Sequence, residues 1–204
     1  SNLVIHNETD NSYTIKKPDA IIIANGDDWL LEKKQIINYL INRKIETIHI
    51  NYPKIRETIP YISNFCSCDP IKIGSDIESY QNIRDIPLIC PNNLLDKLDL
   101  DMESLKKVSY DCDITKSNLK ITSNKCFIPN VQSLCYGLAY LYANGFRNIL
   151  LIGVQGFREP KKNLELINCL SLFGIEYQDL QITSLSNNSL GIKSKSIFEV
   201  MNIK

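Results

Sequence analysis

The sequence of 204 residues predicts a three-layer α/β domain in which a mostly parallel sheet carries helices on both faces. Short, continuous runs of apolar and β-branched residues at 19–24 and 149–152 are typical of strands buried on both faces. Segments with apolar residues at helical spacing alternate with such runs. The length fits a single domain, so we expect one unit over 1–204.

The first third of the sequence predicts a β-α-β unit. The strand at 19–24 is followed by the turn Asn25-Gly26-Asp27-Asp28, in which Asp28 is a residue type that caps helix N-termini. Apolar residues then recur at helical spacing as far as the cations Arg43 and Lys44, which suit a helix C-terminus. A second strand at 47–50 closes a unit of about thirty residues.

The middle of the sequence has no clear period. Three prolines interrupt 51–70, and short apolar pieces follow at 71–73 and 86–90. Residues 99–125 are polar and fit neither a helical nor a strand pattern. We expect short helices, strands and loops over 51–90, whereas the structure of 99–125 stays open.

The last third predicts a helix over 131–143 and a buried strand over 149–152. Asn144-Gly145 supplies the left-handed residue that commonly ends a helix, and the strand ends at Gly153. Cys135 lies on the apolar face of this helix, so packing is its expected role.

A second helix is expected from about residue 160 to Gly174, followed by a strand at 175–177. Residues 183–191 form a polar loop rich in Ser and Asn, and Ser196 starts a short amphipathic piece. At the other end of the chain, residues 1–17 are expected to form an arm that is tag-derived or loosely ordered at its start, because the sequence opens with Ser-Asn. This opening suggests a domain taken from a longer protein.

Composition excludes several classes of protein. The 23 Lys and Arg balance 23 Asp and Glu, which leaves no positive field for a nucleic-acid binder. No apolar stretch approaches the ~18 residues of a membrane-spanning helix, so we expect no membrane partner. Seven cysteines without a repeating spacing or a signal peptide indicate reduced thiols and a cytoplasmic location. His49, one of two histidines, lies within an apolar strand, where a buried core residue is expected rather than a general base.

The balanced charge is unevenly distributed. Residues 1–102 hold 15 acids and 11 bases, whereas 103–204 hold 8 acids and 12 bases. The later half should therefore attract an anionic ligand, which Asp27 and Asp28 would oppose. Lys161 and Lys162 suit contacts with phosphate groups, although a solvated surface is the simpler interpretation.

Candidate ligand-binding residues follow from the rule that ligands of a parallel sheet bind beyond the carboxyl ends of its strands. This rule selects the segments after the two first strands, the start of the 131–143 helix and the turn after 149–152. The residues are Asn25, Gly26, Asp27, Asp28, Asn51, Asn130, Ser133, Gly153, Gln155 and Gly156.

The chemistry of these residues suits a nucleotide or a sugar phosphate. Asn25 and Asn51 each offer an amide donor and acceptor for a base or ribose edge, and Gly26 lets a phosphate approach the backbone. Asp27 and Asp28 suit Mg²⁺, which takes one or two carboxylates together with substrate oxygens. The alternatives are that 25–28 is only a strand-to-helix turn and that Asp28 is only a helix cap.

The turn at Asn25-Gly26, Asn51 at the end of the second strand, and the segment NVQSLCYGLAYLYANGFRNILLIGVQGF at 130–157 together resemble a group of Rossmann-like domains. The group includes the bacterial CMP-sialic-acid-dependent sialyltransferases, the motility accessory factors and the 6-hydroxymethylpterin pyrophosphokinase-like domains. It also includes the C-terminal domain of 4-hydroxy-2-oxovalerate aldolase-like proteins. In these domains a strand ending in Gly-Pro-Ser-Leu opens a nucleotide site.

The resemblance implies roles for particular residues. Asn25, Gly26 and Asn51 match positions that contact the cytidine nucleotide in the sialyltransferases, and Asn130 and Ser133 fall near their contacts at a helix start.

The sequence also departs from the pattern of the group. Asp27-Asp28-Trp29 stands in place of Pro-Ser-Leu, and Gln155 replaces the usual Asp after Gly153. No histidine follows His49, so the catalytic histidine of the sialyltransferases has no counterpart.

Three functions remain open from the sequence. The first is a nucleotide- or phosphometabolite-binding Rossmann-like domain, accessory to a catalytic aldolase-like domain of the same polypeptide in a polysaccharide or sugar pathway. The second is a degenerate interaction module without catalysis. The third is an active CMP-sugar glycosyltransferase or pyrophosphokinase-like enzyme. The expected partners are a small nucleotide or sugar phosphate, with Mg²⁺ as the metal to consider, and a homo-oligomer is compatible with each function.

Overall fold

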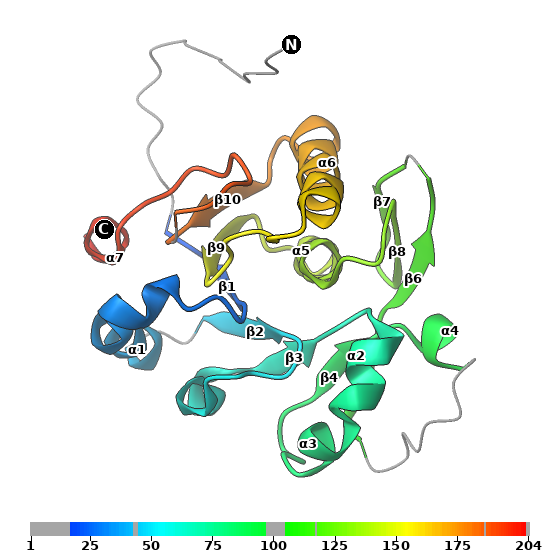
Figure 1. Cartoon of the computed structure of the whole chain (residues 1–204), viewed down its shortest axis with the longest axis horizontal. Helices are drawn as coiled ribbons and strands as arrows, with labels where there is room; N and C mark the ends of the chain where they lie inside the picture. Colours follow the sequence, from blue (N-terminus) through cyan, green and yellow to red (C-terminus); the bar gives the residue numbers. More distant parts are fainter. Residues whose placement is uncertain (1–16, 43–44, 97–104, 117, 186, 203–204) are drawn as a thin grey trace.

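The computed structural model describes residues 17–42, 45–96, 105–116, 118–185 and 187–202. Its centre is a seven-stranded sheet in the order β10-β9-β1-β2-β3-β4-β5, and all of its strand pairs are parallel (Figure 1). The strands of this sheet are β1 (Ala20–Ile23), β2 (Glu46–Ile50), β3 (Asn64–Cys66), β4 (Leu88–Cys90), β5 (Lys107–Ser109), β9 (Asn148–Ile152) and β10 (Gln181–Ser184). The predicted three-layer α/β fold is confirmed.

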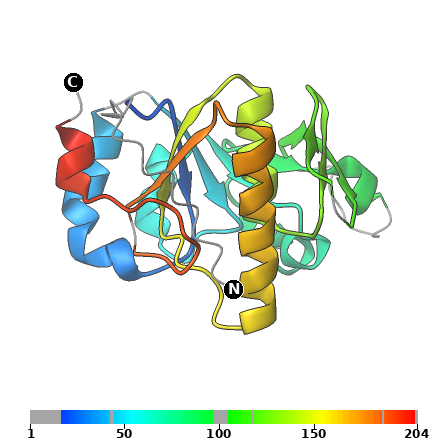
Figure 2. The same ribbon diagram turned by 90° about the horizontal axis from the view of Figure 1, so that it is seen from above.

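Helices cover both faces of the sheet. Figure 2 shows α6 along one side of the sheet, with α1 and α7 side by side along the other. The α-helices are α1 (Lys33–Ile41), α2 (Pro70–Ser75), α3 (Ile77–Gln81), α4 (Asn92–Leu95), α5 (Ser133–Ala143), α6 (Pro160–Glu176) and α7 (Ile197–Met201). Two 3-10 helices, η1 (Asp28–Glu32) and η2 (Arg56–Tyr61), precede α1 and β3.

The strands of the sheet centre are apolar throughout because alternate residues enter two separate cores. In β1, Ala20 and Ile22 pack in the core beneath α5 and α6, whereas Ile21 and Ile23 pack in the core beneath α1 and α7. All four side chains are at most 1% exposed. Burying both faces of a parallel strand in this way produces the continuous apolar run found in the sequence.

A second, three-stranded sheet lies beside α5, in the order β6-β8-β7. It consists of β6 (Asp111–Ile114), β7 (Lys120–Ile121) and β8 (Lys125–Ile128). The inward residues of β6 and β8, Cys112, Cys126 and Ile128, join the core beneath α5. This small sheet lies in and next to the polar stretch 99–125, part of which, 99–104, is outside the described residues.

All seven cysteines are free and buried, and six of them belong to the core beneath α5 and α6. Burial raises the pKa of the Cys66 and Cys135 thiols, because a thiolate is poorly solvated in an apolar interior. The prediction that Cys135 is a packing residue is confirmed.

Three local predictions hold. Gly145 ends α5 with a left-handed φ of 91°. Ser196 starts α7 with a capping box, in which its hydroxyl accepts from the Glu199 N–H and the Glu199 carboxylate accepts from the Ser196 N–H. His49 is buried and hydrogen-bonded within β2.

The predicted helix after β1 begins differently. Residues 28–32 form η1, and only then does α1 run from 33 to 41; Arg43 and Lys44 lie outside the described residues. The prediction that Asp28 caps the helix is wrong, because Asp27 occupies the cap position and its side chain makes no capping bond. Both carboxylate oxygens of Asp28 are instead buried, and they have no hydrogen-bond partner among the described residues.

The predicted stop at Gly174 is also wrong, because α6 continues through it to Glu176. A glycine in a helix interior costs about 0.5–1 kcal/mol, which is less than burying Phe173 contributes. The strand expected at 175–177 therefore forms later, as β10 at 181–184, at the start of the expected polar loop. The expected N-terminal arm, apart from residue 17, lies outside the described residues.

Candidate functional site

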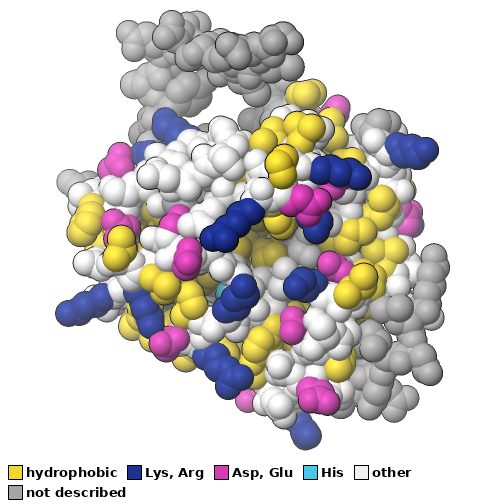
Figure 3. All heavy atoms as spheres, viewed as in Figure 1, with side chains coloured by type: hydrophobic (Ala, Val, Ile, Leu, Met, Phe, Trp, Pro, Cys, Tyr) yellow, Lys and Arg dark blue, Asp and Glu magenta, His cyan; other side chains and the backbone are white. Residues whose placement is uncertain are grey.

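A cavity of about 640 Å³ opens at the carboxyl edge of the main sheet. Figure 3 shows the hollow on this face, with Lys and Arg side chains around it. Between β1 and β9 the chain reverses its direction across the sheet, with α1 following β1 on one face and α5 preceding β9 on the other. Such a switch point is where parallel α/β sheets bind ligands.

Eight of the ten predicted site residues line this cavity: Asn25, Gly26, Asp27, Asn51, Ser133, Gly153, Gln155 and Gly156. Asp28 and Asn130 do not line it. The carboxylate of Asp28 is buried elsewhere, so Asp27 and Asp28 do not present two carboxylates to one ligand. Over the described ranges, no group of three or more His, Cys, Asp or Glu side chains is placed to hold a metal ion.

Gly26 and Gly153 bring the loops after β1 and β9 into direct backbone contact. The N–H of Gly26 donates to the carbonyl oxygen of Gly153 at 2.9 Å. A Cβ atom at Gly26 would lie 2.4 Å from that same oxygen, and one at Gly153 would lie 2.6 Å from the carbonyl oxygen of Ala24. The absence of a side chain at Gly26 therefore makes room for the neighbouring loop, and its N–H is occupied by that loop rather than offered to a phosphate.

Asn25 joins the loop after β1 to the loop after β2. Its Nδ2 donates to the carbonyl oxygen of Tyr52 at 3.0 Å, and its Oδ1 accepts from the N–H of Lys54 at 2.8 Å. Both ends of the amide therefore hold the floor of the cavity in place.

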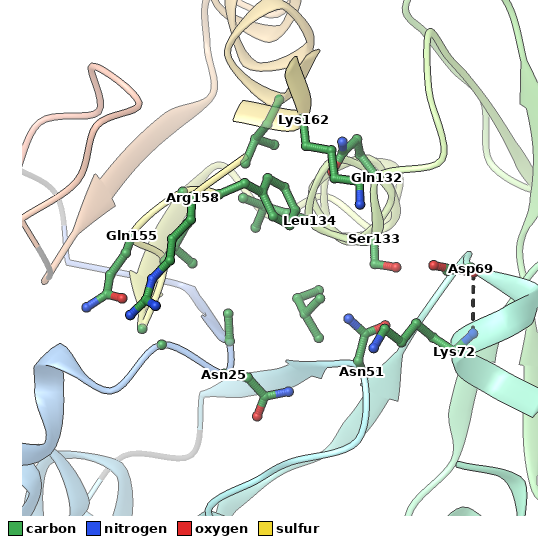
Figure 4. A pocket seen from close by; sticks show the side chains of 18 of the residues that line it. Asn25, Asn51, Asp69, Lys72, Gln132, Ser133, Leu134, Gln155, Arg158 and Lys162 are labelled. Atoms are coloured by element: carbon green, nitrogen blue, oxygen red, sulfur yellow. Dashed lines mark hydrogen bonds between the residues drawn. The ribbon is translucent and has the colours of Figure 1, made fainter. Parts of the chain in front are cut away.

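Asn51 is held in the left-handed region, with a φ of 59°. Its N–H donates to the carbonyl oxygen of Cys66 at 2.9 Å, and its own carbonyl accepts from Nδ1 of His49 at 2.9 Å. The Ser67 hydroxyl donates to Oδ1 of Asn51 at 2.8 Å. This bond fixes the orientation of the amide, and the Nδ2 group points toward the cavity (Figure 4).

His49 is a neutral imidazole that holds the backbone of Asn51 through a hydrogen bond. The side chain is 2% exposed, and burial lowers its pKa to about 4 by disfavouring the charged ring. Its Nδ1 lies 3.1 Å from the carbonyl oxygen of Ile50 and 2.9 Å from that of Asn51, so this nitrogen carries the proton.

The first turn of α5 points into the cavity. Ser133, its first residue, accepts a hydrogen bond on Oγ from the N–H of Cys68 at 3.2 Å. The backbone N–H groups of residues 133–135 have no acceptor among the described residues. Gln132, at the cap position, is 7% exposed and lines the cavity, and its amide makes no hydrogen bond within the described ranges.

Hydrogen bonds from residues outside the cavity hold the segment between β9 and α6 in place. Gly156 has a φ of 102°, and a Cβ there would lie 2.4 Å from Oδ1 of Asn163. That oxygen accepts a hydrogen bond from the N–H of Phe157 at 2.8 Å. The N–H and the hydroxyl of Ser189 both donate to the carbonyl oxygen of Gln155, each at 3.2 Å. These bonds fix the backbone from which Gln155 and Phe157 line the cavity.

Four cations line the cavity that the sequence did not assign to it: Lys54, Lys72, Arg158 and Lys162. Three acids, Asp27, Asp69 and Glu165, oppose them. Lys162 forms an exposed ion pair with Glu159 at 3.0 Å, whereas the other three cations have no ion pair with any described residue. Arg158 and Lys162 come from the later half of the chain, which was expected to attract an anionic ligand, whereas Lys54 and Lys72 come from the first half.

The residues around these cations divide the cavity into two ends. Figure 4 shows Lys72, Lys162, Gln132 and Ser133 toward one side of the cavity, and Gln155 with Arg158 beside it toward the other. The sequence signal for Lys72 is weak, since it lies in the short apolar piece 71–73. For Lys162 the sequence leaves phosphate contact and a solvated surface open, and the structure places this residue on the cavity wall. Only the packing of α2 and α6 against the sheet places both on one cavity.

Within the described ranges, no helix has both the length and the apolar character needed to cross a membrane. Comparisons of the chain with protein-family models, with curated proteins and with solved structures gave no match.

Proposed function

We propose that this protein binds a small phosphate-bearing molecule, a nucleotide or a sugar phosphate, in the cavity at the carboxyl edge of its sheet. The observation that carries the proposal is the open first turn of α5. Ser133 and Leu134, whose N–H groups have no acceptor among the described residues, border the cavity together with Gln132, whose amide makes no hydrogen bond within those residues. A helix N-terminus with free N–H groups favours an anion.

The charges on the cavity wall agree with an anionic ligand. Lys72 and Lys162 lie on the same side of the cavity as Ser133, and Lys72 has no ion pair among the described residues (Figure 4). The Nδ2 group of Asn51 adds an uncharged donor between the two ends. Donors from a helix, two lysines and an amide give the mixture of directed and charged contacts that a phosphate group requires.

The open cavity favours this function over the interaction module. If this edge of the sheet served only protein contacts, we would expect the domain's own side chains to fill the crevice. Here about 640 Å³ stays open, within the size range of small-molecule sites. A role as an accessory to a catalytic domain of the same polypeptide remains part of the proposal.

The test is a binding titration with inorganic pyrophosphate, ribose 5-phosphate, glucose 1-phosphate and a set of nucleotides. Lys72→Ala and Lys162→Ala should each weaken binding of the phosphate-bearing ligand by about tenfold, because each removes a charge-assisted hydrogen bond. Lys161→Ala is the matched control, since Lys161 is exposed on the same helix and does not line the cavity. If no phosphate-bearing compound binds, or if K161A weakens binding as much as K162A, the proposed function is wrong.

A further inference from the structure

Asp27 and Gln155 meet where the loops after β1 and β9 adjoin. Nε2 of Gln155 lies 3.5 Å from Oδ1 of Asp27, and both side chains are exposed and line the cavity. Figure 4 shows Gln155 away from Lys72 and Ser133, at the other side of the cavity.

The backbone holds this pair in place. Gly26, next to Asp27, donates its N–H to Gly153 at 2.9 Å, and the two glycines leave no room for a side chain between the loops. Ser189 bonds the carbonyl oxygen of Gln155 through both its N–H and its hydroxyl. The two side chains therefore start from fixed positions, although they are 128 residues apart in the sequence.

The chemistry of the pair is that of hydroxyl recognition. A carboxylate only accepts hydrogen bonds, whereas a glutamine amide both donates and accepts. Oδ2 of Asp27 and Oε1 of Gln155 have no hydrogen-bond partner among the described residues, and the bond between the two side chains is at the outer limit of length. Two neighbouring hydroxyls can therefore bond the pair, one donating to the carboxylate and the other bonding the amide.

We propose that Asp27 and Gln155 bind the vicinal diol of a sugar whose phosphate group lies at the first turn of α5. The inference rests on the proposed function and narrows it to ligands with both a phosphate and a pair of adjacent hydroxyls. Ribose in a ribonucleotide and a free sugar phosphate share this chemistry.

The experiment compares ligands that differ only in one hydroxyl of the diol. Wild-type protein is titrated with CMP and 2′-deoxy-CMP, with ribose 5-phosphate and 2-deoxyribose 5-phosphate, and with inorganic pyrophosphate, which has no diol. We expect the diol-bearing member of at least one pair to bind about tenfold more tightly than its deoxy partner, the effect of one hydrogen bond to a charged group. A preference in the nucleotide pair alone indicates a ribonucleotide, and a preference in both pairs indicates that a sugar phosphate suffices.

Asp27→Ala and Gln155→Ala test the assignment. The variant that removes the partner of the missing hydroxyl, Asp27→Ala or Gln155→Ala, should bring the affinity ratio within a pair close to one without weakening pyrophosphate binding, whereas Lys72→Ala should weaken both members of a pair equally. Unchanged melting temperatures of D27A and Q155A show that the loops remain folded. The inference is overturned, and the proposed function is not, if the wild type binds phosphate compounds without distinguishing the pairs, or if both variants keep the preference. If no phosphate compound binds, the proposed function and the inference fail together.

Discussion

Replacing Gly26 by alanine tests the close contact on which the cavity depends. A Cβ at this position would lie 2.4 Å from the carbonyl oxygen and 2.9 Å from the carbonyl carbon of Gly153. Both atoms are backbone atoms, so relief requires the loops after β1 and β9 to separate. Gly26 is not among the described residues with a positive φ. Glycine is therefore required here by the lack of room for a Cβ atom and not by the backbone conformation.

The expected cost follows from two contributions. Inserting a methyl group into a packed site costs about 1–3 kcal/mol. Separating the loops also weakens the hydrogen bond from the Gly26 N–H to Gly153, which contributes about 0.5–1.5 kcal/mol. We expect Gly26→Ala to lower the free energy of unfolding by about 2–4 kcal/mol and the melting temperature by roughly 5–15 °C for a domain of this size.

Two other glycines provide matched controls for urea-induced and thermal unfolding. Gly145 has a φ of 91° with no atom within 4 Å of a built Cβ, so Gly145→Ala costs only the left-handed strain of about 1–2 kcal/mol. Gly174 lies inside α6 with open space around it, so Gly174→Ala should stabilise by about 0.5–1 kcal/mol. A Gly26→Ala protein that unfolds within about 0.5 kcal/mol of the wild type would refute the close-contact account, since ordinary surface changes have effects of that size.

Two further predictions concern buried ionisable groups. The folded-state pKa of His49 is about 4 against an ordinary value of 6.5, so the unfolded chain binds the proton first and stability falls as the pH drops from 6.5 to 4. This loss is about 3 kcal/mol at most. His49→Gln should flatten the curve of stability against pH between 6.5 and 4 relative to wild type. An identical slope in both proteins would contradict the conclusion that His49 is buried as a neutral imidazole. Asp28→Asn should raise the free energy of unfolding by about 1 kcal/mol or more, because a neutral amide is less costly to bury than a carboxylate without a hydrogen-bond partner. Chemical denaturation at neutral pH measures this, and a loss of stability would mean that the charge of Asp28 is used.

The elements that local sequence predicted well are those with a strong apolar pattern. The strands β1 and β9, and α5 with its stop at Gly145, were expected close to their observed positions, because each has a buried face that its own residues specify. Elements with weak patterns were missed or misplaced. The small sheet β6-β8-β7 was not expected, and β10 was placed too early because Gly174 was taken as a helix stop.

The general location of the candidate site followed from the sequence, because parallel strands end at one edge and each strand could be identified from its residues. Asn51, Ser133 and Gln155 were therefore expected near each other, and the structure brings them to one cavity. What each side chain does there was decided by tertiary contacts between distant segments. Packing placed Lys72 and Lys162 on that cavity and used the N–H of Gly26 for a neighbouring loop.

The sequence by itself thus determined the fold class and the edge of the sheet at which the candidate site lies, because hydrophobic periodicity and strand direction are local properties. Only the tertiary structure decided that the carboxylate of Asp28 is buried away from the cavity while Asp27 meets Gln155 at one side of it. The physical reason is that hydrogen-bond partners and burial depend on which loops come together in space, and residues 27 and 155 come together only after the whole sheet has formed.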